Sequence, residues 1–333
     1  MKKVKAVQMG CGPIGCSVIK YASQRSDIEF VGAIDIDKNL VGRDLGEVAG
    51  LRKLGILISD QVDAVLSRTQ PHIVFLTTSS SLEALYPQIE KCARAGVNVL
   101  STCEELSYPY KKDPKLSAKI DKIAKANKIT VLATGVNPGF LMDVWPLFMT
   151  GVCQQVNRIK AVRVQNASPR RGPFQKKIGA GCTLEEFKKL KEAGTIKHVG
   201  LPESAAMIAD GLGWEIDEIV EIIEPIIAKT EIRTEFVTVK SGQAAGVRQV
   251  AKGIRAGEEL ITLEFEAAVG APESYDAVYI TGIPNMEVII KGGTHGDIAT
   301  AAIVVNSIHR VIEASPGLLT MKDLSVVSFR SQR

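Results

Sequence analysis

Two short segments of the sequence carry the residues best suited to chemistry, and each follows an apolar run. The first, GCGPIG, spaces Gly10, Gly12 and Gly15 in the pattern G-x-G-x-x-G. The second, LSTCEELSYP at residues 100–109, places Cys103 beside two consecutive glutamates. A glycine-rich turn can bind phosphate, whereas a thiol or a carboxylate can serve as a nucleophile, a metal ligand or a proton-transfer group. These segments are the first candidates for a functional site.

The glycine segment stands in the context that a dinucleotide-binding loop requires, between an expected strand at residues 5–9 and an expected helix at residues 16–23. The first glycine permits a tight turn, the second lets the backbone approach a pyrophosphate, and the third lets the helix pack on the strand. The N–H groups at the helix N-terminus then face the phosphates. The residues predicted to contact the pyrophosphate are Gly10, Gly12, Pro13, Ile14 and Gly15.

A carboxylate occurs where such a loop needs one. Asp35 lies twenty residues after Gly15, at the end of an expected second strand at residues 28–34. There it can accept a hydrogen bond from the ribose 2′-OH of the adenosine, and it would repel a 2′-phosphate. The sequence therefore predicts NAD as the cofactor, while Lys38 and Arg43 nearby leave NADP possible.

Polar residues also lie at the ends of, or just after, the later strands expected at residues 73–78, 97–101 and 129–133. In an open parallel sheet, ligands bind outside the carboxyl ends of the strands, so these residues are expected near the cofactor. The predicted contacts are Thr77, Thr78, Ser79, Ser101, Thr102 and, towards the nicotinamide, Asn137. Ser80 is also expected to cap the following helix.

The loop LSTCEELSYP admits four interpretations. A metal site has little local support, because no His or Asp cluster lies near in sequence. A nucleophilic thiol is disfavoured, since neighbouring glutamates raise the pKa of Cys103. A proton-transferring carboxylate and an ordinary exposed loop both remain open from the spacing alone. At most one of Glu104 and Glu105 is expected to face the cleft, and Glu105 is assigned to an exposed loop.

The pattern along the chain predicts two domains. Residues 1–135 alternate apolar strands with helices, which predicts a Rossmann-type parallel sheet with helices on both faces. Residues 136–294 contain many period-two segments and predict an α+β domain built on a mostly antiparallel sheet. Helices are expected there from Thr183 and through residues 202–227. The last segment, about 295–333, is expected to form an amphipathic helix that packs back on the first domain.

Composition limits the class of protein. The chain of 333 residues is 45% apolar and 23% charged, with a net charge of +4 that is spread without a basic block. We expect a soluble globular protein with neither a nucleic-acid partner nor a membrane span. Six cysteines without CxxC pairing predict reduced thiols in the cytoplasm and no structural metal.

Several segments together resemble one family. They are GCGPIG, GAIDIDKNLVGRDLGEVAG, LSTCEELSYP, GVNPGFLMD, HVGLPES and the C-terminal GGTHGDIATAAIVVNSIHRVIEASPGLLTMKDL. The chain resembles, over nearly its whole length, the 2,4-diaminopentanoate dehydrogenases and the related NAD(P)-dependent amine dehydrogenases. Their architecture is shared with dihydrodipicolinate reductase. The resemblance implies oxidative deamination of an amine to a ketone, most closely 2,4-diaminopentanoate to 2-amino-4-oxopentanoate in ornithine degradation. It also implies a homodimer and a catalytic role for Glu104.

The implied chemistry agrees with the residues. One carboxylate can hold an ammonium group, take its proton and then activate water. An arginine fork would suit a substrate carboxylate. The residues predicted, more weakly, to contact substrate are Phe140, Met142, Arg170, Arg171 and His198. Two alternatives are a reductase of a cyclic imine or keto compound and a non-catalytic dinucleotide sensor. The His-His pair of dihydrodipicolinate reductases is absent from the sequence.

Overall fold

The computed structural model describes residues 3–331, and the chain divides into two compact units. The first unit contains residues 1–140 and 295–333, and the second contains residues 141–294. The predicted boundary after residue 135 lies a few residues before the observed one. The second unit is therefore an insertion in the chain of the first.

The first unit is built on a seven-stranded sheet in the order β15-β6-β5-β4-β1-β2-β3. Every pair of neighbouring strands in it is parallel. The strands are β1 (Val4–Met9), β2 (Ile28–Ile34), β3 (Ile58–Ser59), β4 (Ile73–Leu76), β5 (Asn98–Ser101), β6 (Thr130–Ala133) and β15 (Gly317–Leu319). The Rossmann-type sheet predicted from the sequence is confirmed.

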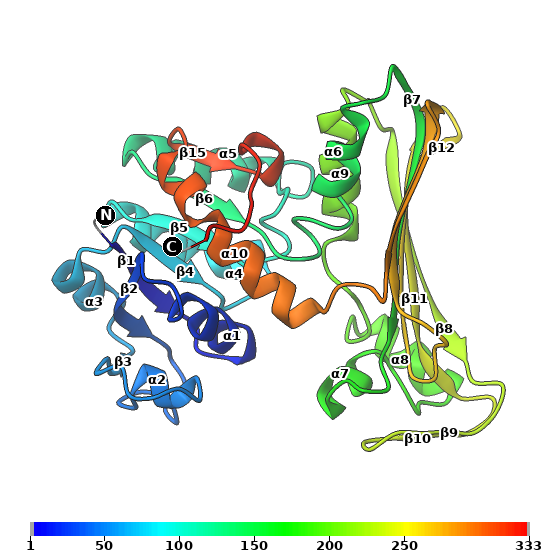
Figure 1. Cartoon of the computed structure of the whole chain (residues 1–333), viewed down its shortest axis with the longest axis horizontal. Helices are drawn as coiled ribbons and strands as arrows, with labels where there is room; N and C mark the ends of the chain where they lie inside the picture. Colours follow the sequence, from blue (N-terminus) through cyan, green and yellow to red (C-terminus); the bar gives the residue numbers. More distant parts are fainter. Residues whose placement is uncertain (1–2, 332–333) are drawn as a thin grey trace. The chain divides into compact units, whose positions relative to one another are not determined.

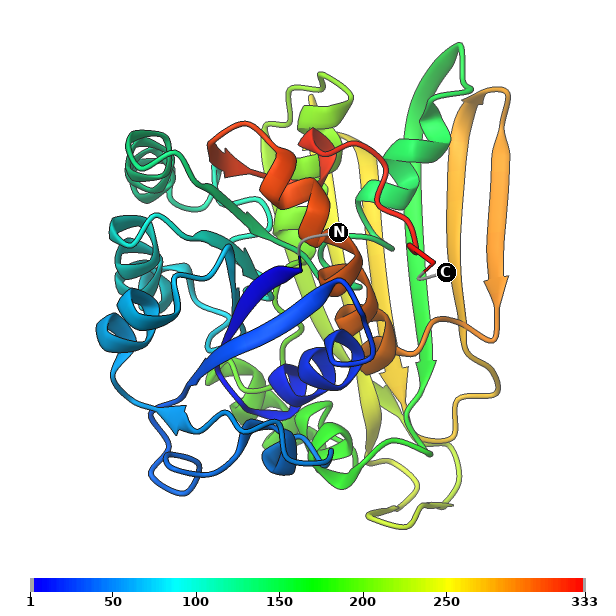
Figure 2. The ribbon, with the colours of Figure 1, turned by 60° about the vertical axis from the view of Figure 1, so that its left-hand side comes forward.

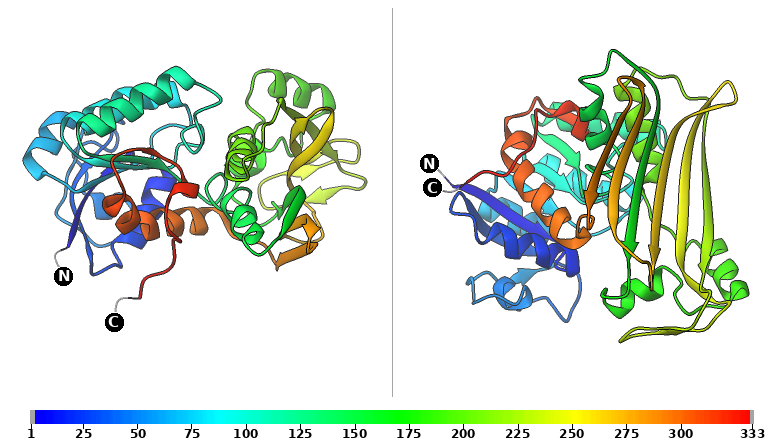
Figure 3. Two further views of the ribbon diagram at one scale, coloured as in Figure 1. Left: turned by 90° about the horizontal axis from the view of Figure 1, so that it is seen from above. Right: turned by 45° about the vertical axis from the view of Figure 1, so that its right-hand side comes forward.

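Helices cover both faces of this sheet (Figure 3, left), and α1 follows directly from β1 (Figure 2). They are α1 (Pro13–Ala22), α2 (Leu45–Val48), α3 (Val62–Thr69), α4 (Leu82–Arg94), α5 (Pro114–Ala126), α10 (Gly296–Glu313) and the 3₁₀ turn η1 (Met321–Asp323). All residues of β4 and β6 are buried, as strands covered on both faces require. The sequence did not reveal β3 and β15, which have two and three residues and lie at the sheet edges.

Polar side chains attach α10 to the first unit. Arg25 Nε donates to Asp27 Oδ1 at 3.0 Å, and His309 Nε2 of α10 lies 2.8 Å from Asp27 Oδ2. Asn306 Oδ1, also on α10, accepts from Arg25 Nη1 at 3.3 Å. Burial raises the pKa of Asp27, but the hydrogen bonds from Arg25 and His309 outweigh it and lower that pKa to about 2. The last long helix is therefore part of the first unit.

The second unit is built on a six-stranded sheet in the order β14-β13-β7-β12-β11-β8 (Figure 3, right). All neighbours are antiparallel except β7 and β12, so the predicted mostly antiparallel sheet is confirmed. The strands are β7 (Gln155–Asn166), β8 (Glu218–Ile227), β11 (Ala244–Arg255), β12 (Glu258–Ala268), β13 (Tyr275–Ile283) and β14 (Met286–Lys291), with a separate hairpin of β9 (Ile232–Arg233) and β10 (Thr238–Val239).

The helices of the second unit are α6 (Val144–Thr150), α7 (Gly172–Lys177), α8 (Leu184–Glu192) and α9 (Leu201–Gly211). The expectation of helix through residues 202–227 is wrong in its second half, where Glu218–Ile227 form β8. This segment, EIVEIIEPII, is rich in β-branched isoleucine, and its Pro225 is tolerated because β8 is an edge strand. Among residues 3–331, no helix is both long and apolar enough to cross a membrane.

The two faces of the second sheet differ. Helices α6 and α9 lie on one face (Figure 1), and α9 packs on β8, β11 and β12. We call the opposite side the outer face. Cross-strand register gives it a central row that consists of Ile222, Val250, Glu264, Val162, Ala277 and Ile289. The end residues Ile222 and Ile289 are 37% and 43% exposed.

Candidate active site

The parallel alignment of the first sheet collects the predicted cofactor residues at one edge. The loops after β1, β2, β4, β5 and β6 all leave the sheet at its carboxyl end. The strand order reverses between β4 and β1, and ligands bind outside such a switch point. The phosphate loop, Asp35, Thr77 and Glu104 therefore belong to one region of the first unit.

The phosphate loop has the geometry that its glycines predict. Gly10 has φ +93°, and a Cβ there would lie 2.7 Å from the Thr77 carbonyl oxygen. A Cβ at Gly15 would lie 2.1 Å from the Gly10 carbonyl oxygen, so both positions exclude any larger residue. Gly12, the N-cap of α1, has no atom within 4 Å of where its Cβ would be. The open space at this helix N-terminus fits the approach of a dinucleotide pyrophosphate.

Asp35 is tied directly to this loop. Its Oδ2 accepts from the Cys11 N–H at 2.6 Å, and its Oδ1 accepts from the Asp37 N–H at 2.9 Å. These two backbone donors fix the orientation of the carboxylate at the end of β2. Each oxygen retains acceptor capacity for a ribose hydroxyl.

The hydroxyl groups after β4 have partners within the protein. Thr77 Oγ1 donates at 2.8 Å to the carbonyl of the first loop glycine, and Thr78 Oγ1 lies 2.9 Å from a glutamine side chain of α4. Ser79 Oγ accepts from the Ser81 N–H at 3.0 Å. Ser81, rather than the predicted Ser80, is the N-cap of α4. These hydroxyls position the loop, and their contact with a cofactor stays a prediction.

Hydrogen bonds from serine side chains and from the backbone also fix the loop after β5. The buried Ser101 hydroxyl donates at 2.8 Å to the last carbonyl of β4 and accepts from the Cys103 N–H at 3.1 Å. The Thr102 N–H donates to the same β4 carbonyl at 3.2 Å. The Glu104 carbonyl accepts from Ser107 N–H and Oγ at 3.1 and 2.7 Å. The half-buried Glu104 therefore stands on a rigid turn at the carboxyl edge.

The adjacent Glu105 has a different, structural role. Its Oε2 accepts at 2.8 Å from the N–H of Leu82, the first residue of α4. Its Oε1 pairs with Lys112. A carboxylate is stabilising at a helix N-terminus. The Glu105 side chain is only 16% exposed, so the expectation that it belongs to an exposed loop is wrong. One glutamate of the pair holds the loop to α4.

The thiol beside these glutamates lacks the exposure and the lowered pKa that a nucleophilic cysteine needs. Cys103 is 1% exposed and belongs to the hydrophobic core of the first unit. Burial, with the nearby charges of Glu104 and Glu105, raises the pKa of its thiol to about 12. Among residues 3–331, no three His, Cys, Asp or Glu side chains group in a way that could hold a metal ion.

The loop after β6 carries the remaining cofactor candidate. Asn137 is 8% exposed and precedes a cis peptide bond to Pro138. The Val136 N–H donates to Thr300 Oγ1 of α10 at 3.2 Å, which anchors this loop within the first unit. Beyond it, Phe140 is half-buried.

The first residues of the second unit are less open. Met142, which the sequence predicted to contact substrate, is 1% exposed and therefore lies in the interior of the protein. The neighbouring Asp143 caps α6 and accepts from the Ser204 hydroxyl of α9 at 2.7 Å.

The basic segment of the second unit separates into two parts. Arg171 is exposed and is the N-cap of α7, whereas the half-buried Arg170 stacks its guanidinium 4.4 Å from the Phe174 ring centre.

Arg163 on β7, which the sequence analysis did not single out, is 2% exposed. Burial and the nearby charge of Arg170 lower the pKa of Arg163.

Arg163 is incompletely paired among the described residues. Its Nη2 donates to the Thr294 carbonyl at 2.7 Å, while its Nη1 lies 3.6 Å from Asp276 and has no hydrogen-bond partner. Its burial could not be predicted from the strand pattern, because the face that Arg163 shares with Ile159 and Ala161 also carries Gln155 and Asn157.

His198 is held firmly in its loop. Its N–H donates to Gln249 Oε1 and its carbonyl accepts from Gln249 Nε2, both at 2.8 Å. The centres of the His198 and Phe265 rings lie 4.7 Å apart, with 31° between the ring planes. Its contact with a substrate stays a prediction.

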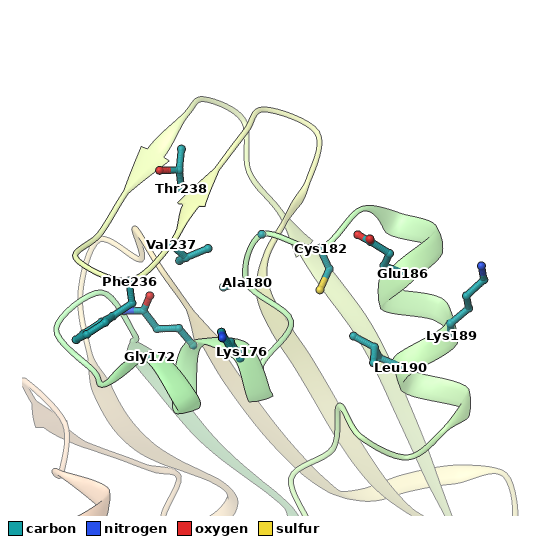
Figure 4. Close-up of a pocket in the computed structure, with 12 residues that line it drawn as sticks. Gly172, Lys176, Ala180, Cys182, Glu186, Lys189, Leu190, Phe236, Val237 and Thr238 are labelled. Atoms are coloured by element: carbon teal, nitrogen blue, oxygen red, sulfur yellow. The ribbon is translucent and has the colours of Figure 1, made fainter.

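A separate hollow of about 560 Å³ lies in the second unit between α7, α8 and the β9–β10 hairpin (Figure 4). Phe236 and Leu190 contribute apolar surface, and Lys176 and Cys182 contribute polar groups. None of the residues predicted to contact substrate lines it.

The fold and the site define a class: an oxidoreductase with an N-terminal dinucleotide-binding unit. Residues 4–106 match the N-terminal domain of dihydrodipicolinate reductase, and residues 140–331 match the 2,4-diaminopentanoate dehydrogenase C-terminal domain. The chain belongs to the 2,4-diaminopentanoate dehydrogenase family. This confirms the resemblance seen in the sequence and supports NAD(P) as the cofactor.

Individual relatives agree over nearly the full length. The chain is 33% identical to 2,4-diaminopentanoate dehydrogenase of Acetoanaerobium sticklandii, over 98% of this chain and 94% of that protein. It is 26% identical to an amine dehydrogenase of Streptomyces virginiae, over 96% of each chain. The structure of amine dehydrogenase from Mycobacterium smegmatis superposes with a TM-score of 0.85 at 25% identity, covering 98% of this chain and 97% of that one.

The open space at Gly12 gives a direct test of the cofactor site. Gly12 has φ −69°, which alanine adopts without strain, so Gly12→Ala is expected to fold with an unchanged melting temperature. The added methyl group would occupy the pyrophosphate space, and we expect NADH to bind roughly tenfold more weakly or worse. Titration of NADH fluorescence measures this.

Gly15→Ala is the matched comparison, because its methyl group would meet the Gly10 carbonyl and lower the melting temperature. Unchanged NADH affinity in a well-folded Gly12→Ala variant would contradict the assignment of this loop.

Proposed function

We propose that the protein catalyses the NAD-dependent oxidative deamination of a small amine to a ketone, with Glu104 as the catalytic residue. Membership of the 2,4-diaminopentanoate dehydrogenase family supports the reaction class. The observation that carries the role of Glu104 is its half-buried position on a rigid turn at the carboxyl edge of the sheet that also bears the phosphate loop. Glu105, its only neighbouring carboxylate in that loop, is already used as a helix cap.

The proposed steps assign Glu104 three tasks. Its carboxylate first holds the substrate ammonium and takes one proton, which leaves a neutral amine; this proton passes on to solvent, so that Glu104 is ionised again before the next step. A nicotinamide dinucleotide held by the phosphate loop would accept the hydride from the amine-bearing carbon, and the substrate would thereby become a cationic iminium. The carboxylate stabilises this cation electrostatically and then takes a proton from the water that attacks its carbon. Glu104 then returns this proton to the nitrogen of the adduct, the C–N bond breaks to release ammonia, and loss of the hydroxyl proton leaves the ketone.

Glu104→Gln tests this assignment, because glutamine keeps the size of the side chain and loses the base. We expect kcat for amine oxidation to fall roughly 10²- to 10⁴-fold while NADH affinity stays within twofold. Glu105→Gln is the matched control: it keeps an acceptor for the Leu82 N–H, so turnover is retained and only thermal stability falls. Wild-type kcat in Glu104→Gln would refute its catalytic role.

For the cofactor we propose NAD rather than NADP. Asp35 presents a carboxylate whose orientation is fixed by two backbone donors, and a 2′-phosphate placed there would meet its negative charge. Lys38 is exposed beyond it.

For the substrate we propose an amine that also carries a carboxylate, as 2,4-diaminopentanoate does. The buried Arg163 and the nearby Arg170 concentrate positive charge in the second unit, and Arg163 Nη1 has no hydrogen-bond partner among the described residues. Guanidinium groups bind carboxylates through charge-assisted hydrogen bonds. This pair supports a carboxylate-binding role better than the exposed Arg171 does.

A substrate panel separates these possibilities. We expect kcat/KM with NAD to be highest for 2,4-diaminopentanoate and lower for 2-aminopentane, and to be lower again with NADP. Arg170→Gln is expected to reduce the preference for the carboxylate-bearing substrate roughly tenfold or more, because it removes a charged hydrogen bond, while Arg171→Gln leaves it unchanged. A preference for 2-aminopentane over the diamino acid in the wild type would refute the substrate class.

We also propose a homodimer formed through the outer face of the second sheet. The central row is apolar at most positions, with Ile222 and Ile289 exposed at its ends. Charges of both signs lie in and beside it: Glu264 of the row pairs with Lys160 at 2.9 Å, and Arg248 beside it pairs with Glu266 at 3.1 Å. A surface with apolar and mixed-charge strips can be complementary to itself about a two-fold axis.

The oligomeric state follows directly from this proposal. Light scattering after size exclusion should give twice the 35.9 kDa mass of one chain. Ile222→Lys places a charge in the apolar row and should shift the mass to that of one chain without lowering helix content, whereas Val326→Lys, at an exposed position of the first unit, should not. A monomeric wild type at micromolar concentration would refute the dimer.

A further inference from the structure

One peptide unit of the phosphate loop is held by side chains from three separate segments. The carbonyl of Gly10 accepts from Gln8 Nε2 and from Thr77 Oγ1, both at 2.8 Å. The N–H of the same peptide, which belongs to Cys11, donates to Asp35 at 2.6 Å. Gln8 lies on β1, Thr77 follows β4 and Asp35 follows β2. The Gly10–Cys11 peptide is therefore fixed at both ends.

Gln8 is an unusual residue for its position. It is 0% exposed within β1, a central strand of the parallel sheet, where an apolar side chain would cost nothing in polar burial. Its Nε2 donates to the Gly10 carbonyl and also to Thr77 Oγ1, at 2.9 Å. Its Oε1 has no hydrogen-bond partner among the described residues. The buried, unsatisfied oxygen of Gln8 destabilises the fold, whereas its two donated hydrogen bonds both hold the phosphate loop.

The Gly10–Cys11 peptide needs these hydrogen bonds because glycine leaves its orientation free. Gly10 has φ +93°, a value accessible to glycine, and the same freedom lets its peptide unit rotate. Rotation of the Gly10–Cys11 peptide would exchange the positions of its N–H and carbonyl groups. Asp35 would then face a carbonyl oxygen, and the donor set of the loop would change. Two donors aimed at the carbonyl select one of the two orientations.

We propose that Gln8 and Thr77 are positioning residues for dinucleotide binding, which act by holding the Gly10–Cys11 peptide in its binding-competent orientation. This inference rests on the proposed use of a dinucleotide and extends it to the two side chains that hold the phosphate loop. It also reassigns Thr77, whose hydroxyl is expected to orient the loop rather than to contact the cofactor.

The test compares NADH affinity with thermal stability in apolar, similarly sized variants. In Gln8→Met and Thr77→Val the donors are lost and the shape is nearly kept. We expect the double variant to bind NADH roughly tenfold more weakly, with each single variant weaker than the wild type by a smaller factor, because the binding-competent fraction of the loop falls. The melting temperature of Gln8→Met should change little, since the unsatisfied Oε1 is removed together with the two hydrogen bonds.

Thr130→Val is the matched control. Thr130 is a buried threonine of β6 whose hydroxyl donates to the Ser315 carbonyl at 3.3 Å, away from the loop. It should lose thermal stability and keep NADH affinity. NADH binding by Gln8→Met/Thr77→Val within twofold of the wild type would overturn the proposal, as would a fall in melting temperature without a change in affinity. Because the readout is NADH binding, failure of amine turnover does not affect it.

Discussion

The parallel alignment of the first sheet is the constraint on which the site depends. Parallel strands deliver every connecting loop that starts at a carboxyl end to the same edge, whatever the distance along the chain. Gly10, Asp35, Thr77 and Glu104 are separated by many residues, yet the register of β2, β1, β4 and β5 brings their loops together. Hydrogen bonds between neighbouring loops then fix them: Asp35 with Cys11, Thr77 with Gly10, and Glu105 with the start of α4.

Two consecutive glutamates illustrate how the fold divides similar side chains between different tasks. Glu105 satisfies an N–H group at the start of α4 and pairs with Lys112, so its charge contributes to the stability of the loop. That fixed neighbour gives Glu104 a rigid backbone, to which Ser107 adds two hydrogen bonds. Such a support suits the base that we propose Glu104 to be, because its position then does not depend on the substrate.

The sequence was sufficient for the parts of the site that depend on local pattern. The glycine spacing, the strand before it and Asp35 identified the dinucleotide-binding unit, because each of these has a steric or electrostatic reason that acts within a few residues. It was insufficient where a side chain meets a distant segment. Gln8 appears in the sequence as one polar residue in a strand, and its partners become visible only when β4 lies beside β1.

The second unit was harder to predict for the same reason. Its period-two segments indicated an antiparallel sheet, but EIVEIIEPII fits a helix and a strand almost equally, and only pairing with β11 decides for β8. Arg163 was overlooked because its burial follows from the register of β7 with its neighbours. The local sequence could not state that register.

The return of the chain to the first unit has a consequence for synthesis on the ribosome. Residues 295–333 contribute α10 and the edge strand β15, which pairs with β6, and Arg25 and Asp27 hydrogen-bond to side chains of α10. The nascent dinucleotide-binding unit consequently lacks a helix and a strand until the segment after residue 294 emerges, while residues 141–294 are complete before that. A chain released early would expose the apolar surface that α10 covers, and so be available to chaperones and proteases before it could engage a cofactor.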